Sequence, residues 1–331
     1  YALAIGVFIG GVVQLLFQLP FLYRAKMLAR PRWAWQDENV KKVRKLMLPA
    51  LFGVSISQIN LLLDTVIASL LMTGSIAWLY YSDRLIEFPL GLFGIGIATV
   101  ILPALSKLHS SKKSSDFQHT LDWGVRFVIF LGLPAMIGLM IISPLIITVL
   151  FDHGAFKEAG IDHVKAVSLG VMAYSVGLVS FMLIKVLAPG FYARQDTKTP
   201  VRIGIITLVL NMVFNIMLAP FIGYLGLALA TSMSASCNAF LLYRQLKKEN
   251  VYQFSSMSLY FTLKCFVASI VMGLLVWFTS EQYSWTTWHF SEQVILLLVL
   301  LAIAGLSYFT LLFLMGVRLN TIKSVAITES N

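Results

Sequence analysis

The chain has 331 residues, of which 58% are hydrophobic and only 12% are charged. Because soluble domains carry about 25% charged residues, this composition excludes an ordinary soluble domain and predicts an integral membrane protein. The formal net charge of +10 does not by itself indicate binding to nucleic acid, because membrane proteins gather Lys and Arg in their cytoplasmic loops.

Nine segments of the chain are apolar over about the 20 residues that a membrane-spanning helix needs. None of them alternates polar and apolar residues, as the strands of a membrane barrel do. We therefore predict an all-α polytopic membrane protein with about nine transmembrane helices. In chain order, the predicted helices cover residues 2–23, 46–72, 76–106, 125–151, 164–190, 200–222, 224–243, 258–280 and 291–317.

The loops between these segments alternate between basic and non-basic. Loop 24–45 contains eight Lys and Arg residues, whereas the loop near 73–76 contains none, and the alternation continues to the basic tail 318–331. The positive-inside rule therefore predicts an N-terminus on the outer side of the membrane and a cytoplasmic C-terminus. Because this pattern accounts for most of the positive charge, no nucleic-acid partner is expected.

The N-terminal part of the chain carries two further expectations. Tyr1 stands where a Met would begin a complete protein, and a run of spanning length starts at once, so we expect a piece of a longer protein. Residues 33–47 mix Trp, Val and Leu with Lys and Arg, which indicates either an amphipathic helix on the cytoplasmic surface or a solvated linker.

Three charged residues interrupt the apolar stretch "WLYYSDRLIEFPLGLFGIG" (78–96). Asp83 and Glu87 are one helical turn apart, and Arg84 is three residues before Glu87, so the three side chains can meet. Charges within spanning helices are costly and usually face the bundle interior or a wet cavity. One interpretation is a self-neutralising cluster that fixes helix packing. In the other, Arg84 binds phosphate or carboxylate oxygens of a substrate, and Asp83 and Glu87 orient it.

A Pro and Gly break follows these charges. Pro89 removes a backbone hydrogen bond and invites a kink, and Gly91, Gly94 and Gly96 add backbone freedom. Such a pattern suits a helix that must bend beside a cavity. We therefore predict a hinge at Pro89, Gly91 and Gly94.

Oxygen-bearing side chains form a second predicted cluster. Counting from the helix ends places Asp64, Asn215 and Thr231 at one depth, roughly 11 Å below the outer surface at 1.5 Å per residue. Asn60 and Asn211 lie one turn further in, on the same helix faces. Carboxylate, amide and hydroxyl oxygens are hard ligands that suit Na⁺ or a proton relay. The alternative interpretation is hydrogen bonding between helices.

Other features predict packing rather than chemistry. Small residues recur at every fourth position within 226–236, which predicts a helix face for close packing. Lys185 lies near the end of its segment, where its amino group can reach the membrane surface. Cys237 and Cys265 lie in apolar runs and indicate core residues rather than a disulfide or a metal site.

Three stretches together resemble one family. They read "YYSDRLIEFPLGLFGIGIATVILPALSK" (80–107), "KVLAPGFYARQDTKTP" (185–200) and "GGVVQLLFQLPFLYRAK" (10–26). They are similar to the MurJ (MviN) lipid II flippases of bacteria, within the MOP transporter superfamily, and the resemblance covers the whole chain.

The resemblance implies a domain organisation. The family has fourteen spanning helices with both ends in the cytoplasm, so the nine predicted segments would correspond to family helices six to fourteen. These are the end of the first lobe, the second MOP-type lobe and two extra C-terminal helices. The implied parts are the last helix of the first lobe (1–23), a cytoplasmic amphipathic linker (24–45), the second six-helix lobe (46–243), a cytoplasmic loop (244–257), a C-terminal helix pair that forms a groove for the lipid tail (258–317) and a cytoplasmic tail (318–331).

The resemblance also implies transport rather than catalysis. Family members move lipid II, the undecaprenyl-pyrophosphate-linked disaccharide-pentapeptide, from the cytoplasmic to the periplasmic leaflet of the bacterial inner membrane by alternating access, for peptidoglycan synthesis. The implied partners are lipid II and membrane lipids, and a monomer is expected. Arg84 would belong to the cationic central cavity of the family, with Asp83 and Glu87 beside it.

Some members of the family also carry a sodium site that resembles the second cluster. The resemblance assigns it to Asp64, Asn211, Asn215, Thr231 and the backbone carbonyl of Leu227. The position of Asn215 is Asp in that pattern, and the loss of a carboxylate should weaken Na⁺ binding. No cofactor is required, and either Na⁺ or the membrane potential would drive the cycle.

Two other functions remain open at the level of sequence. Another exporter of the MOP type, for drugs or a different polyprenyl-linked saccharide, would share the same helices. A membrane-embedded cell-wall enzyme would need a periplasmic catalytic loop with acidic residues, and only the short loop 152–163 comes close. The chain lacks the P-loop and HExxH motifs, and nothing outside the membrane is large enough to form an enzyme active site, so we do not expect an enzyme.

Overall fold

The computed structural model describes the chain except for residues 1, 27–33, 153–155, 157–161, 284–287 and 318–331, and except for the side chains at 2, 3, 39, 46 and 48–57. The predicted cytoplasmic tail 318–331 lies outside the described residues. The described part is helical, with short turns and loops between the helices. Two compact units divide the chain, Tyr1–Met47 and Leu48–Asn331.

The first unit contains α1 (Ala2–Arg24) and the first turns of α2 (Glu38–Ser69). The extent of α1 confirms the predicted segment 2–23. The start of α2 corrects the predicted start at 46, and it makes the end of the expected linker helical. Neither Gly nor Pro separates Glu38 from Leu48, so nothing in the sequence stops the helix before the apolar run.

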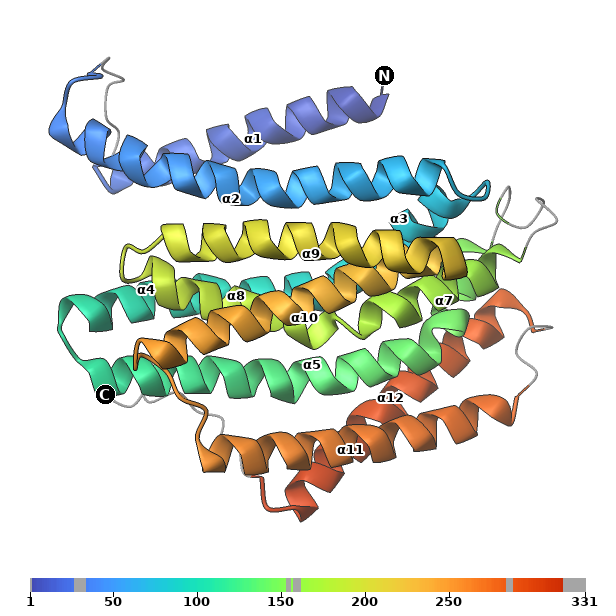
Figure 1. Cartoon of the computed structure of the whole chain (residues 1–331). Coiled ribbons are helices and arrows are strands. Elements are labelled where there is room, and N and C mark those ends of the chain that lie inside the picture. The colour runs from blue at the N-terminus through green and yellow to red at the C-terminus, as the bar shows by residue number, and fades with distance from the viewer. Residues whose placement is uncertain (1, 27–33, 153–155, 157–161, 284–287, 318–331) are drawn as a thin grey trace. The chain divides into compact units, whose positions relative to one another are not determined.

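The second unit contains the rest of α2 and the helices that follow it (Figure 1). They are α3 (Ser75–Pro89), the π-helix η1 (Leu90–Ile95), α4 (Gly96–Ser110), α5 (Ser114–Phe151), α7 (His163–Ser175), α8 (Leu178–Tyr192), α9 (Lys198–Ile222), α10 (Tyr224–Lys248), α11 (Ser256–Glu281) and α12 (Phe290–Leu314).

Within the described part of the chain, seven helices are long and apolar enough to cross a membrane, and the bent pair α7 and α8 brings the number to eight. Helices α3 to α4 count as one continuous span, Ser75–Ser110. The ninth predicted span, 46–72, corresponds to α2, of which the described side chains supply only the apolar stretch Gln58–Ser69. The chain is therefore a multi-pass helical membrane protein, and its ninth span stays a prediction.

Helix α5 is the centre of the second unit and packs against α4, α7, α8, α11 and α12. It begins at Ser114, well before the predicted start at 125. The reason is an apolar stripe that already starts in the first turn, because Phe117, Leu121, Val125 and Val128 are all buried at helical spacing. The predicted segment therefore gave the apolar part of a longer helix.

The predicted segment 164–190 is not one helix. Helices α7 and α8 are bent by 41° relative to each other, with the break at Val176 and Gly177. A Cβ atom added at Gly177 would lie 2.7 Å from the Cα atom of Ser232 on α10. The Ser232 hydroxyl also lies at hydrogen-bonding distance from the carbonyl oxygens of Ala173 (2.9 Å) and Tyr174 (3.2 Å), at the end of α7. The break thus lies at a close contact with α10.

Helices α9 and α10 run side by side (Figure 1). A Cβ atom at Gly226 would lie 2.6 Å from the backbone carbon of Leu218, so only glycine allows this approach. Further along, the Ser234 hydroxyl donates to the Thr207 carbonyl oxygen at 2.7 Å. The small residues of 226–236 therefore form a packing face, as predicted.

Helices α11 and α12 pack against each other and against α5 (Figure 1). The Tyr308 hydroxyl of α12 donates to the Phe130 carbonyl oxygen of α5 at 2.6 Å. On their other sides, large apolar side chains such as Leu274, Phe278 and Phe313 are exposed. Exposed apolar surface of this extent suits contact with lipid.

Candidate functional site

Helix α3 has one face against the protein and one face open. Trp78, Ser82 and Ile86 are buried, and the Ser82 hydroxyl donates to the Val167 carbonyl oxygen of α7 at 2.9 Å. A Cβ atom at Gly170 of α7 would lie 2.3 Å from the Ser82 hydroxyl oxygen, so the two helices are in close contact. This packing fixes which residues of α3 point away from the core.

Two of the predicted charges, Arg84 and Glu87, lie on the open side of α3, and with the half-buried Asp83 they form the α3 charge cluster. An Arg84 Nη1 atom lies 2.6 Å from Glu87 Oε2, and about half of each of these two side chains is exposed. The Arg84 guanidinium also stacks over the ring of Tyr80, 4.9 Å from its centroid. The structure therefore brings Arg84 and Glu87 together as the spacing predicted.

Asp83 takes a different position from its two neighbours. It is half-buried, and within the described part of the chain it forms no ion pair. Of the two carboxylates, only Glu87 contacts the guanidinium. Arg84 thus retains N–H groups that can donate to the oxygens of a phosphate or a carboxylate.

The predicted break after the cluster is a π-helix rather than a sharp kink. Helix α3 ends at Pro89, and η1 continues through Leu90–Ile95 without leaving the helical path. Single turns of π-helix are rare in proteins, and those that occur often lie at functional sites. Gly94 packs closely, because a Cβ atom there would lie 3.1 Å from a Leu90 methyl group and 3.6 Å from Lys185 of α8, whereas Gly91 has nothing within 4 Å.

The predicted oxygen cluster is also brought together, and we call it the Asp64 network: Asn60, Asp64, Asn211, Asn215 and Thr231. Asn215 Nδ2 donates to Asp64 Oδ1 at 2.7 Å and to Asn211 Oδ1 at 2.9 Å. Thr231 Oγ1 and Asn60 Nδ2 each donate to Asp64 Oδ2 at 3.3 Å, and Asn211 Nδ2 donates to Thr231 Oγ1 at 3.3 Å. Helices α2, α9 and α10 therefore meet at one carboxylate.

The chemistry of this network fits a monovalent cation. Its candidate ligands are one carboxylate, amide and hydroxyl oxygens, and the Leu227 carbonyl oxygen, which lies 3.0 Å from Thr231 Oγ1 and is the alternative acceptor for its one hydrogen. Two oxygens in it, Asn60 Oδ1 and Asn215 Oδ1, are buried and have no hydrogen-bond partner in the described part of the chain. Buried polar atoms are normally satisfied, so these two oxygens are available ligands.

Reasoning from the sequence missed a third polar cluster, at the basic end of α5. Asp122 is buried, and its carboxylate pairs with Arg126 and accepts from the Ser258 hydroxyl at 2.7 Å and the Tyr252 hydroxyl at 3.0 Å. Burial and the neighbouring Asp122 carboxylate raise the pKa of Tyr252 above its ordinary value. The i, i+4 spacing of Asp122 and Arg126 was the available signal, but the helix was predicted to begin after Asp122.

Lys185 was predicted only to reach the membrane surface, and the structure adds a contact. Its side-chain stem passes beside η1, with its Cγ atom 3.6 Å from where a Gly94 Cβ atom would stand. Its side chain is exposed. Lys185 is therefore a second cation next to the π-helix that follows Arg84.

A family model for the lipid II flippase MurJ matches residues 1–312 of the chain. A probable lipid II flippase MurJ of Vibrio cholerae is 55% identical over 97% of this chain and 61% of its own length. The corresponding protein of Haemophilus influenzae is 55% identical over 96% of this chain and 63% of its own length. A lipid II flippase MurJ of Burkholderia cenocepacia is 37% identical over 96% of this chain and 62% of its own length. The chain thus spans about three fifths of these relatives.

Solved structures give a consistent fold. A lipid II flippase MurJ in an inward closed conformation superposes with a TM-score of 0.68 at 25% sequence identity, over 88% of this chain and 58% of that one. An outward-facing multidrug transporter of the MATE family, in the MOP superfamily, superposes with a TM-score of 0.53 at 16% identity, over 82% of this chain and 64% of that one. The second match concerns the fold alone.

Proposed function

We propose that this chain, which belongs to the lipid II flippase family MurJ, takes part in moving lipid II from the cytoplasmic to the periplasmic leaflet of the bacterial inner membrane. Lipid II is the undecaprenyl-pyrophosphate-linked disaccharide-pentapeptide from which peptidoglycan is made. The observation that carries the proposal is the match of the family model over residues 1–312. Family membership makes the chain part of a transporter rather than an enzyme.

Arg84 is the residue that we propose for binding the head group. Its guanidinium is exposed on α3, and Glu87 and Tyr80 hold it from the side and from below. A planar guanidinium donates paired hydrogen bonds to phosphate oxygens, so it suits the pyrophosphate of lipid II. Glu87 limits the side-chain rotamers of Arg84, and Asp83 adds negative charge beside it, so both would act as positioning residues.

The π-helix is the proposed site of bending. A transporter with alternating access must change the path of at least one helix near its substrate. Pro89 lacks an N–H group, and a Cβ atom at Gly91 would meet no neighbour, so η1 can change its winding at low cost. Bending there would move Arg84 relative to Lys185. The two cations would then contact the head group in turn as it moves.

The Asp64 network is the proposed ion site. Asp64, Asn211, Asn215, Thr231 and the Leu227 carbonyl would hold a Na⁺ ion, which would supply one positive charge to balance the carboxylate. The network joins α2 to α9 and α10, so its state would affect how these helices pack. The Asn215 amide already donates to the Asp64 and Asn211 oxygens, which supports a transport cycle that depends only weakly on Na⁺. The membrane potential is the alternative driving force for that cycle.

Localisation and partners follow from the same proposal. The alternating loop charges support a cytoplasmic C-terminus. The exposed apolar side chains of α11 and α12 support the role of this helix pair as the groove for the polyprenyl tail. Lipid II and membrane lipids would be the partners, and a monomer would suffice.

The proposal can be tested in cells whose own lipid II flippase is depleted. Expression of the complete gene product should restore growth and the labelling of lipid II by a reagent that cannot cross the membrane. Failure to restore either, at a membrane level equal to that of the native flippase, would contradict the proposal. Resistance to drugs without restored labelling would favour the alternative of a MOP-type drug exporter.

A further inference from the structure

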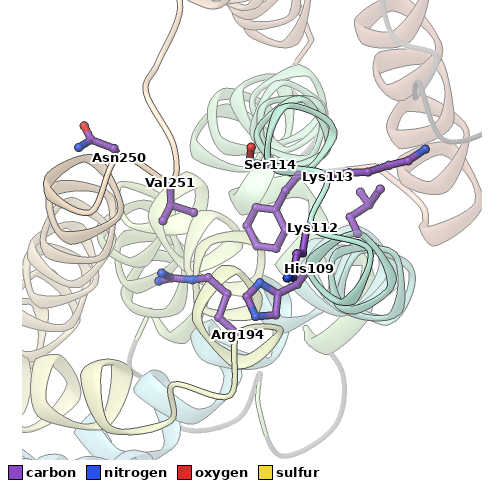
Figure 2. Close-up of a pocket in the computed structure, with 9 residues that line it drawn as sticks. His109, Lys112, Lys113, Ser114, Arg194, Asn250 and Val251 are labelled. Atoms are coloured by element: carbon purple, nitrogen blue, oxygen red, sulfur yellow. The ribbon is translucent and has the colours of Figure 1, made fainter.

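A hollow of about 310 Å³ lies where the α4–α5 turn, the end of α8 and the α10–α11 loop meet. Its size falls within the range of small-molecule sites. Its lining includes His109, Lys112, Lys113 and Arg194, which carry cationic or titratable groups, and Phe117 and Val251, which carry apolar surface. In Figure 2 the Lys113 side chain extends away from His109 and Arg194. Among the residues that the structure describes, neither Asp nor Glu lines it. The hollow is therefore basic, and it is separate from both the α3 charge cluster and the Asp64 network.

Arg194 is held in place at the wall of the hollow. Its Nε atom donates to the Gly190 carbonyl oxygen at 3.0 Å, and its Nη2 atom lies 2.7 Å from Glu249 Oε2. Its guanidinium also stacks over the ring of Phe191, 5.3 Å from the centroid. These contacts use only some of the N–H groups of Arg194. The remaining N–H groups are held in place and can donate to an anion.

Lys112 supplies charge without a partner. Within the described part of the chain it forms no ion pair, whereas Arg194 pairs with Glu249 and Lys113 lies 3.8 Å from Asp116. The His109 ring packs edge-on against Phe117 and makes no hydrogen bond there within the described residues. Unpaired charge in an indented surface is the usual setting for a bound counter-ion.

The backbone at Lys112 is in the left-handed region, with φ at 55°. Helix α4 ends with the Lys112 N–H donating to the His109 carbonyl oxygen and the Lys113 N–H donating to the Leu108 carbonyl oxygen, each at 3.1 Å. Glycine is the ordinary residue at such a helix end, because a side chain there costs about 1 kcal/mol. A lysine thus occupies this position in spite of its backbone conformation.

We propose that this hollow binds a phosphate group, carried either by the head group of an anionic phospholipid or by a soluble phosphate ion. Lys112 and Arg194 would donate to its oxygens from two sides, and His109 would line the floor. The inference does not depend on the proposed transport. The competing explanation is that the carbonyl ends of α4, α8 and α10 and the positive-inside rule together attract basic residues here. That explanation predicts no ligand.

Thermal unfolding of the purified chain in a neutral detergent tests the proposal. The midpoint would be measured with added sodium phosphate, with added phosphatidylglycerol and with phosphatidylcholine, at matched ionic strength. We expect phosphatidylglycerol or phosphate to raise the midpoint by about 3 °C relative to phosphatidylcholine. A rise with phosphatidylglycerol alone identifies the lipid head group, and a rise with both identifies the phosphate group itself.

Lys112→Gly separates binding from stability. Glycine relieves the backbone at this position, so the basal midpoint should stay equal or rise, while ligand affinity should fall about tenfold because a charged donor is lost. Two matched controls should keep the ligand-induced rise. Asn250→Gly changes a second left-handed residue (φ 54°) that lines the hollow, and Lys26→Gly removes a lysine with the same backbone (φ 54°) that does not line it.

Three results would overturn the proposal. One is no rise with either phosphate or phosphatidylglycerol. Another is an unchanged rise in Lys112→Gly. The third is an equal loss in Lys26→Gly, because this would mean that net charge rather than the hollow determines binding.

Discussion

The α3 charge cluster and the Asp64 network are both polar groups in an apolar protein, yet they differ in how many of their hydrogen-bonding atoms have a partner. In the Asp64 network the carboxylate accepts from Asn60, Asn215 and Thr231, and the side chains mainly satisfy one another. In the α3 charge cluster, Arg84 uses one pair with Glu87 and keeps exposed donors. Polar groups that satisfy one another hold helices together, and among the described residues of the Asp64 network only the Asn60 and Asn215 amide oxygens stay free for a cation. The free donors of Arg84 can instead bind an anion.

The largest expected difference between the two clusters is the loss of transport in Arg84→Ala. We expect transport by the complete gene product to fall more than tenfold, because a charge-assisted contact to the head group is removed. Because the side chain is exposed, the thermal midpoint should not change. Rescue of flippase-depleted cells measures the first effect and thermal unfolding the second. Arg202→Ala, at another exposed arginine, is the control, and equal rescue by both variants would break the comparison.

The Asp64 network should respond in the opposite way, through stability. Asp64→Leu removes one of the two acceptors of the buried Asn215 amide, and it leaves Thr231 with only the Leu227 carbonyl oxygen as acceptor. We expect the free energy of unfolding to fall by about 2 kcal/mol. Asp64→Asn, which keeps an oxygen acceptor, should lose less. Unfolding in denaturant measures both, and a Leu variant as stable as the parent would show that the network holds nothing together.

A smaller effect tests the ion-binding side of the network. Asn215→Asp places a second carboxylate beside Asp64, and two neighbouring carboxylates repel each other unless a cation lies between them. We expect the midpoint in Na⁺ to exceed that in choline by about 3 °C in this variant, and by less in the parent chain. If Na⁺ stabilised the variant no more than the parent, the assignment of these oxygens as ion ligands would be wrong.

The smallest effects concern the glycines of η1. Gly91→Ala should change the free energy of unfolding by less than about 1 kcal/mol in the stabilising direction, because alanine favours helix and the position is open. If bending at η1 is part of the cycle, the same variant should nevertheless slow transport. Gly94→Ala should lower the free energy of unfolding slightly, because the added methyl group would lie only 3.1 Å from a Leu90 methyl group. A Gly91→Ala variant with unchanged transport would remove Gly91 from the hinge.

The sequence allowed the Asp64 network to be predicted because its geometry follows from simple rules. Spanning helices are rods of known rise, so residue counts from their ends give depth. Asp64, Asn215 and Thr231 were expected at one depth, and their side chains do meet. Arg84 and Glu87 were predicted to meet for an equally local reason, the i, i+3 spacing on one helix.

The features that escaped prediction depend on contacts between distant parts of the chain. The break between α7 and α8 lies where Gly177 meets Ser232, and no periodicity within 164–190 reports that contact. Asp122 accepts hydrogen bonds from Tyr252 and Ser258, which are more than a hundred residues away in the sequence. The hollow at Lys112 is likewise built from three separate segments. Local sequence patterns predict helices and their buried faces, whereas such sites depend on how distant segments of the chain pack together.

Binding of lipid II to the purified complete gene product, followed by native mass spectrometry, tests the role of Arg84 most directly. We predict that Arg84→Ala lowers the fraction of protein bound to lipid II at least tenfold, that Arg84→Lys lowers it less, and that Arg202→Ala leaves it unchanged. Equal occupancy in the parent protein and in Arg84→Ala would contradict the assignment of the α3 charge cluster as the head-group site.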